Sequence, residues 1–148
     1  MSLIQAMTSV NWLAILISGI VFMVLGFVWY SVIFGKQYGV YTGMTAEKMK
    51  EQPPNQMIVP YVITFVCALL QVWALAGLLK EIGVLAVTDT TPIKTALGVA
   101  LIIWVGFVGA PTLAGYVFER RPLGLWAINT GLYLVNLLVA AIILVVIR

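Results

Sequence analysis

The stretch PLGLWAINTGLYLVNLLVAAIILVVI, residues 122–147, contains no charged side chain and decides how the rest of the chain is interpreted. The hydrocarbon core of a membrane is about 30 Å thick, and roughly 20 apolar residues of α-helix cross it. Three further stretches without charge, residues 1–35, 52–79 and 95–118, are also long enough. Short polar segments separate the four stretches, so the pattern predicts four transmembrane helices.

The overall composition agrees with this interpretation. The 148 residues are 63% hydrophobic and 9% charged, and the mean hydropathy is +1.11. Soluble domains are about half apolar and about one quarter charged. A soluble protein of this composition would expose large apolar patches to water and aggregate. The composition therefore predicts an all-α membrane protein.

We expect one domain over residues 1–148, folded as a compact bundle of four transmembrane helices. The spans are predicted at about residues 12–34, 59–79, 93–118 and 123–147. Asn11 is a suitable N-cap for the first span, and Pro60 suits the first turn of the second. The third helix is expected to be kinked at Pro111, because proline removes a backbone donor and clashes with the preceding turn. A short interfacial helix capped by Thr45 is predicted at about residues 45–51.

Several classes of function are disfavoured by what the sequence lacks. The net charge of +3 is small and scattered, which argues against nucleic-acid binding. There is no histidine, and Cys67 is the only cysteine, so we expect no metal, redox or cofactor site. All five acidic residues fall in predicted loops: Glu47, Glu51, Glu81, Asp89 and Glu119. We therefore predict no catalytic residue and no enzymatic activity.

Proton-coupled transport is also disfavoured, because it normally needs an ionisable residue within a span. Small multidrug transporters have a similar four-span size but depend on a carboxylate inside the first span. The first span here contains no carboxylate, and its interior offers Ser18 and glycines.

Two polar stripes are the best candidates for a polar interior or pore lining. The last span carries Asn129, Tyr133 and Asn136 at i, i+4 and i+7, which places them on one helical face. The second span carries Gln71 near its middle, on a similar stripe with Thr64 and Cys67. These side chains either line a pore or binding groove, or hydrogen-bond to neighbouring helices and fix the bundle. The second interpretation is the simpler one.

The third span carries small residues that favour close helix packing: Gly98, Gly106, Gly109, Ala110 and Ala114. Such residues let two helix backbones approach closely. The partner is either another span of the same chain, which we favour, or a helix of a second subunit. Together with Pro111, the cluster is also compatible with a gating kink.

The basic residues favour one orientation in the membrane. Lys36, Lys48, Lys50, Arg120 and Arg121 fall on one side, whereas Lys80, Lys94 and Arg148 fall on the other. The five-to-three excess of basic residues on the first side predicts that the loops after the first and third spans are cytoplasmic and that both termini lie outside. Aromatic residues near the span ends fit an interfacial belt: Trp12, Trp29, Tyr30, Tyr61, Tyr116 and Trp126. The deeper Trp73 and Trp104 are expected to be ordinary core or lipid-facing rings.

Three local patterns together resemble a known family. They are Asn11-Trp12; Gly26-x-x-Trp29-Tyr30-Ser31-x-x-Phe34-Gly35-Lys36; and Tyr116-x-Phe118-Glu119-x-Arg121-Pro122-Leu123 followed by Ile128-Asn129. This combination resembles the mainly bacterial integral-membrane family catalogued as domain of unknown function 1761. The resemblance implies a small four-span protein of the bacterial inner membrane with no assigned activity. Family members often have Tyr-His where this chain has Leu132-Tyr133, so no role of that histidine carries over.

Two functions remain. The first is a structural or interaction subunit that packs in the lipid against copies of itself or a larger membrane complex. The alternative is an oligomeric channel or facilitator for a neutral or weakly polar small solute, lined by Gln71, Asn129, Tyr133 and Asn136. Four helices alone enclose almost no lumen, so the alternative requires an oligomer or a groove between subunits.

Overall fold

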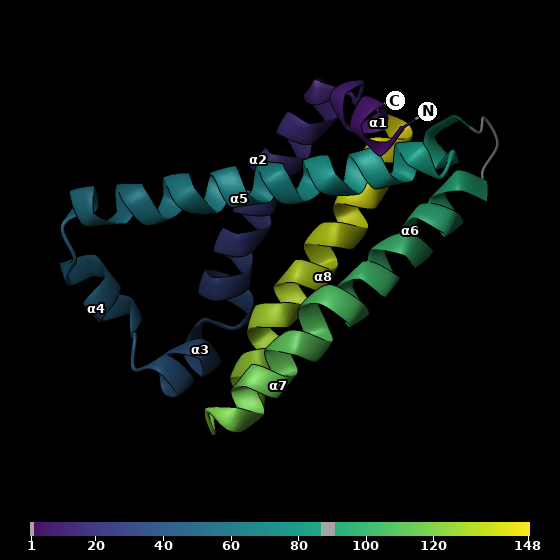
Figure 1. The fold of residues 1–148 in the computed structure, drawn as a ribbon. Helices are drawn as coiled ribbons and strands as arrows, with labels where there is room; N and C mark the ends of the chain where they lie inside the picture. Colours follow the sequence, from purple (N-terminus) through teal and green to yellow (C-terminus); the bar gives the residue numbers. More distant parts are fainter. Residues whose placement is uncertain (1, 87–90) are drawn as a thin grey trace.

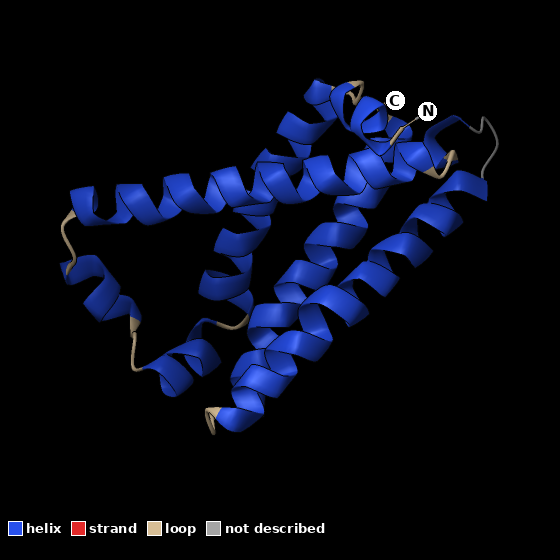
Figure 2. Cartoon of the chain, in the orientation of Figure 1, coloured by secondary structure: helices blue, strands red, loops and turns tan. Residues whose placement is uncertain are grey.

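The computed structural model describes residues 2–86 and 91–148, without the side chain of Thr91. Asp89, one of the acids expected in loops, lies outside this range. Every regular element in the described residues is helical (Figure 2). In chain order the elements are α1 (Leu3–Thr8), α2 (Trp12–Val28), the π-helical turn η1 (Trp29–Ile33), α3 (Gly35–Thr42), α4 (Ala46–Glu51), α5 (Pro54–Glu81), the 3₁₀ turn η2 (Val84–Ala86), α6 (Thr91–Ile103), the π-helical turn η3 (Trp104–Gly109), α7 (Ala110–Phe118) and α8 (Leu123–Val146).

The four apolar helices predicted from the sequence are present. Within the described residues, four helical segments are long and apolar enough to cross a membrane: Trp12–Ile33, Pro54–Glu81, Pro92–Phe118 and Leu123–Val146. The connection between the last two is a tight turn, in which Arg120 adopts a left-handed conformation with φ 54° and the Arg121 amide donates to the Tyr116 carbonyl at 2.9 Å. Both termini lie at the same end of the molecule (Figure 1).

The central element is α8. Half of the residues in its most apolar 18-residue segment are buried inside the protein, compared with 17% for the corresponding segment of the span formed by α6, η3 and α7. Helix α2 packs on α8, as do α6 and α7. The main apolar core lies toward the end that holds the termini, where α5 joins these helices. Its fully buried large side chains are Val72, Leu79 and Leu144.

The expected compact bundle is wrong for the first half of α5. Helix α5 crosses α2 where Gly19 permits close approach, and its amino-terminal half extends away from α2 and α8 (Figure 1). Residues 58–64 are all exposed. Hydropathy could not reveal this difference, because a side chain facing lipid and one facing another helix are equally apolar.

Of the three helix-start predictions, the caps at Asn11 and Thr45 are confirmed and the position of Pro60 is wrong. The Asn11 side chain accepts from the Leu13 and Ala14 amides at 3.0 and 3.3 Å, so the predicted N-cap is confirmed. Pro60, by contrast, lies inside α5, which begins at Pro54. Pro54 already occupies the first turn, where its missing N–H costs nothing. The short helix predicted at 45–51 is also present as α4, with the Thr45 hydroxyl accepting from the Lys48 amide at 3.3 Å.

The interruption expected at Pro111 takes the form of a π-helical turn. Just before the proline, η3 widens the helix, and the Ala110 amide donates to the Val105 carbonyl, five residues back. The Thr112 hydroxyl then donates to the Val108 carbonyl at 2.5 Å, which satisfies an acceptor near the proline. Helices α6 and α7 continue in nearly the same direction in Figure 1, so the wider winding replaces a sharp bend.

The short helix α1, which the sequence did not predict, folds back over the carboxyl-terminal end of α5. Ser2 forms a capping box with Gln5, in which each residue's side chain accepts from the other's backbone amide. The Trp73 indole donates to the Met7 carbonyl at 2.8 Å, and the Lys80 ammonium donates to the Ser9 carbonyl. Trp73 therefore ties α1 to α5 and is not merely a core ring.

The crossing of α2 and α5 can be tested at Gly19. A Cβ there would lie 2.6 Å from Leu69 Cδ2 and 3.3 Å from Phe65 Cε2. We expect Gly19→Val to lower the free energy of unfolding by about 1–3 kcal/mol, because the added methyl groups overpack the crossing. The measurement is SDS-driven unfolding in mixed micelles. The control is Gly115→Val, since no heavy atom lies within 4 Å of the new Cβ. Equal losses for both variants would contradict the observed crossing.

Candidate functional site

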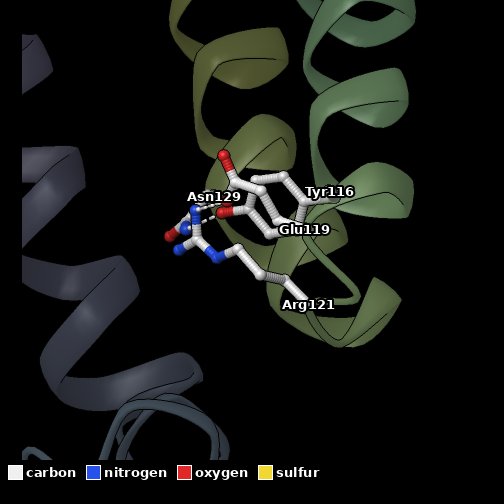
Figure 3. A network of polar contacts seen from close by, with 4 residues as sticks. All are labelled: Tyr116, Glu119, Arg121 and Asn129. Carbon is white, nitrogen blue, oxygen red and sulfur yellow. Dashed lines mark hydrogen bonds and ion pairs between the residues drawn. The ribbon is translucent and has the colours of Figure 1, made fainter.

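At the end of the molecule opposite the termini, Asn129 joins three helical segments. The Tyr30 hydroxyl, from η1, donates to Asn129 Oδ1 at 2.7 Å. Asn129 Nδ2 donates in turn to the Tyr116 hydroxyl, on α7, at 2.9 Å (Figure 3). One side chain of α8 thus uses both its acceptor and a donor to hold a neighbour on each side.

The network continues to the surface through Arg121. Its guanidinium carbon lies 4.2 Å from the centroid of the Tyr116 ring, the geometry of a cation–π contact. Arg121 Nη1 also lies 3.4 Å from Glu119 Oε2 (Figure 3). Both charged side chains are substantially exposed, so this ion pair contributes little by itself. The ion pair and the cation–π contact together hold the Arg121 side chain beside the Tyr116 ring.

Three tryptophans surround this network and donate to α8 or α7. The indole of Trp29 donates to the Ile128 carbonyl, and that of Trp104 donates to the Thr130 carbonyl, each at 2.8 Å. The Trp126 indole donates to the Thr112 hydroxyl at 3.0 Å. Trp104 is therefore not an ordinary ring. These bonds connect neighbouring helices, which is how a buried indole N–H is normally satisfied.

The Asn129 network and the hydrogen bonds of the three indoles hold neighbouring helical segments together, and we refer to them as the clamp. Asn129 and the three indoles form hydrogen bonds with other parts of the chain. They are therefore poorly placed to recognise a solute. The Asn129 side chain is thus hydrogen-bonded to neighbouring helical segments, as the simpler of the two interpretations of the polar stripe predicts.

The other two members of the stripe on α8 lie in different surroundings. Tyr133 is 42% exposed, and its ring lies 6.2 Å from that of Phe22. Asn136 is 3% exposed, and neither its amide nitrogen nor its carbonyl oxygen has a hydrogen-bond partner within the described residues. The stripe predicted as one surface is thus divided among a network, a groove and a buried position.

The groove brings together polar residues from both predicted stripes. A cavity of about 230 Å³ lies where α2, α5 and α8 meet. Its wall includes Thr64, Cys67 and Gln71 from α5 and Tyr133 from α8. The Thr64 hydroxyl is already used, donating to the Pro60 carbonyl at 2.7 Å. Among the described residues, neither the Gln71 amide nor the Tyr133 hydroxyl forms a hydrogen bond.

The predicted seam of small residues does not lie inside the chain. Gly98, Gly106, Ala110 and Ala114 are exposed, and a Cβ at Gly98 or Gly106 would meet no heavy atom within 4 Å. Only Gly109 is buried, beneath the Trp104 ring. The small residues that face α8 are Ala96 and Ala100 instead. Packing within one chain, the option we favoured, is therefore wrong for this set, and packing between subunits stays a prediction.

Sequence reasoning missed Tyr30 and Tyr116 as partners of Asn129, having assigned both to an aromatic belt. A usable signal existed: two of the three patterns that carry the family resemblance contain Tyr30, Tyr116 and Asn129 between them. Residues far apart in the chain but belonging to one recurring pattern are candidates for spatial contact. Their hydrogen bonds show that here they meet.

Comparison with known proteins gives a family and no activity. Residues 13–145 match the family described as "Protein of unknown function (DUF1761)". The matched range contains most of all four candidate spans and the complete Tyr30–Asn129–Tyr116 network. No curated protein and no solved structure matches the chain.

Two asparagines on α8 provide a matched test of the clamp. Asn129→Leu removes two hydrogen bonds and leaves two tyrosine hydroxyls without their partner, so we expect a loss of about 1–2 kcal/mol in the free energy of unfolding. Asn136→Leu breaks no hydrogen bond and removes an unpaired buried amide, so it should be neutral or stabilising. SDS-driven unfolding of both variants gives the comparison. A larger loss at Asn136 than at Asn129 would contradict this division of roles.

Proposed function

The chain belongs to the DUF1761 family of proteins of unknown function, and we propose that it works as a membrane-embedded interaction subunit that associates with further copies of itself. The observation that carries the proposal is the outward face of the span formed by α6, η3 and α7. This span is the least buried of the four, and it presents Gly106, Ala110 and Ala114 outward.

Helix association in lipid depends on close packing, because lipid tails are as apolar as leucine and supply no hydrophobic drive. A glycine with no neighbour within 4 Å leaves room for the backbone of another helix. Large exposed side chains flank this space, among them Phe107 at 79% and Val117 at 59% exposure. They can close around a partner helix seated on the small residues. A second copy offers the same complementary surface, as a two-fold interface requires.

The clamp around Asn129 supports a non-enzymatic role. It stiffens the end of the molecule where α7 and α8 meet, and a rigid subunit loses less conformational entropy when it associates. The polar side chains that the fold gathers there hold helices together. The proposed activity is therefore assembly within the membrane, without a cofactor.

We place the protein in the bacterial inner membrane, with both termini on the non-cytoplasmic side. The excess of basic residues in the α3–α4 region and in the turn at Glu119–Arg121 supports this orientation.

Self-association can be tested by placing a large side chain on the outward face of the span formed by α6, η3 and α7. We expect the wild type to form dimers in lipid nanodiscs or mild detergent, and Gly106→Leu to raise the dissociation constant at least about tenfold, since the helices can no longer approach closely. Single-molecule photobleaching or analytical ultracentrifugation gives the measurement.

Ala74→Leu is the matched control, because Ala74 is exposed on a different span, α5. It should dissociate no more readily than the wild type. A wild type that is always monomeric, or equal weakening by both substitutions, would overturn the proposal. A monomer found attached to a different membrane protein would favour a subunit of a larger complex instead.

A second candidate, an oligomeric facilitator for a neutral solute, is favoured by one observation: Gln71 and Tyr133 line the same groove. If this function holds, glycerol entry into proteoliposomes should exceed that of empty vesicles, and Gln71→Leu should reduce it. Asn129 contributes to this candidate only indirectly, because it is bonded to Tyr30 and Tyr116. Glycerol entry equal to that of empty vesicles would remove this candidate for that solute.

A further inference from the structure

The groove between α2, α5 and α8 contains two polar side chains that form no hydrogen bond within the described residues. On α5 its wall runs from Ile63 to Gln71, so it adjoins the exposed stretch of residues 58–64. Gln71 and Tyr133 lie on its wall, and neither polar end is hydrogen-bonded within the part of the chain that the structure describes. The Trp29, Trp104 and Asn129 side chains elsewhere in the molecule are all paired.

The groove lies about midway along the spans. Helices α2 and α8 run antiparallel, and their contacts fix the register. The Trp29 ring lies against Gly131, and the Asn11 side chain donates to the Ile147 carbonyl at 3.2 Å. Phe22, on the groove wall, lies between these two contacts and touches the Tyr133 ring. Water is scarce at this depth, so an unpaired amide and hydroxyl there cost free energy until a partner binds them.

The side chains that line the groove indicate an uncharged partner that can accept hydrogen bonds. Lysine, arginine and carboxylate side chains are missing from the lining, so a charged group would have no counter-charge. The Gln71 amide and the Tyr133 hydroxyl can both donate to an acceptor such as a carbonyl oxygen. The rings of Phe22 and Tyr133, 6.2 Å apart, offer an aromatic surface beside these donors.

The size and surroundings of the groove add a second constraint. Its volume of about 230 Å³ is below the roughly 300 Å³ at which pockets for whole drug-sized ligands begin. It therefore suits a small head group. A tail would lie along the exposed apolar side of α5, where Ile63 and Val66 face outward.

We propose that this groove binds the uncharged, carbonyl-bearing head of a membrane-soluble amphiphile, with Gln71 and Tyr133 donating hydrogen bonds to the carbonyl and Phe22 packing against the head. This inference goes beyond the proposed function and does not depend on it, because self-association was assigned to α6, η3 and α7.

Cys67 provides the test, since it lines the groove, is exposed and is the only cysteine of the chain. The probe is octanophenone, an uncharged aryl ketone with an alkyl tail, and its matched control is octylbenzene, which lacks the carbonyl. The full chain in nanodiscs is alkylated with N-ethylmaleimide, and intact mass gives the rate. We expect octanophenone to slow alkylation about fivefold more than octylbenzene at equal membrane concentration, the ratio that one net hydrogen bond confers.

Variants then locate the hydrogen bonds. Gln71→Leu and Tyr133→Phe should each reduce the difference between the two probes, and the double variant should abolish it. Gln56→Leu and Tyr61→Phe are matched controls on exposed positions of α5 outside the groove, and they should retain the full difference. Equal alkylation rates of all variants without probe establish that the groove is intact.

Three results would overturn the proposal. The first is equal protection by both probes, which means apolar filling alone. The second is an undiminished preference for octanophenone in the double variant. The third is a wild-type Cys67 that N-ethylmaleimide does not alkylate in nanodiscs even at alkaline pH, where the reactive thiolate forms most readily, because a groove closed to this reagent is also closed to the ketone.

Discussion

In hydrocarbon a hydrogen-bond donor has to find its acceptor within the protein, and this constraint explains most of the polar contacts in the structure. The indoles of Trp29 and Trp104 reach carbonyls of α8 that already belong to helical turns. Asn129 accepts the hydrogen bond of the Tyr30 hydroxyl and also donates one to the Tyr116 hydroxyl. A few side chains thereby orient three spans, although each such bond in a membrane averages only about 0.6 kcal/mol.

The two ends of the molecule are held by different interactions. At the end with the termini, α2, α5, α6 and α8 share an apolar core, and α1 packs on α5. At the other end, the Asn129 network and the indoles connect η1, α7 and α8, while α5 takes no part in that network. Because α5 is anchored at only one end, its first half diverges from the other helices (Figure 1). The groove wall includes Ile63 and Thr64 of this half as well as Gln71, so the groove adjoins the diverging segment. The open groove is thus a consequence of this uneven distribution of contacts.

The spans and several local signals could be read from the sequence, because length, charge and capping are properties of contiguous residues. Asn11 and Thr45 cap the helices assigned to them. Questions about partners could not be settled in this way. Asn129 and Asn136 look equivalent on one face of a helix, yet within the described residues the Asn129 side chain forms two hydrogen bonds and the Asn136 side chain forms none. Gly106 and Ala100 are both small, but only the alanine faces α8, since apolar periodicity does not separate lipid from protein.

The most direct test of the membrane-spanning arrangement is amide hydrogen exchange of the chain in nanodiscs, followed at residues 55–66. This half of α5 is helical but mostly exposed, so lipid has to supply the protection from exchange that tertiary packing supplies elsewhere. We predict that these amides exchange as slowly as those in the middle of α8 and far more slowly than those of α4. Exchange at residues 55–66 as fast as in α4 would show that this segment lies in water, and the four-span arrangement would be wrong.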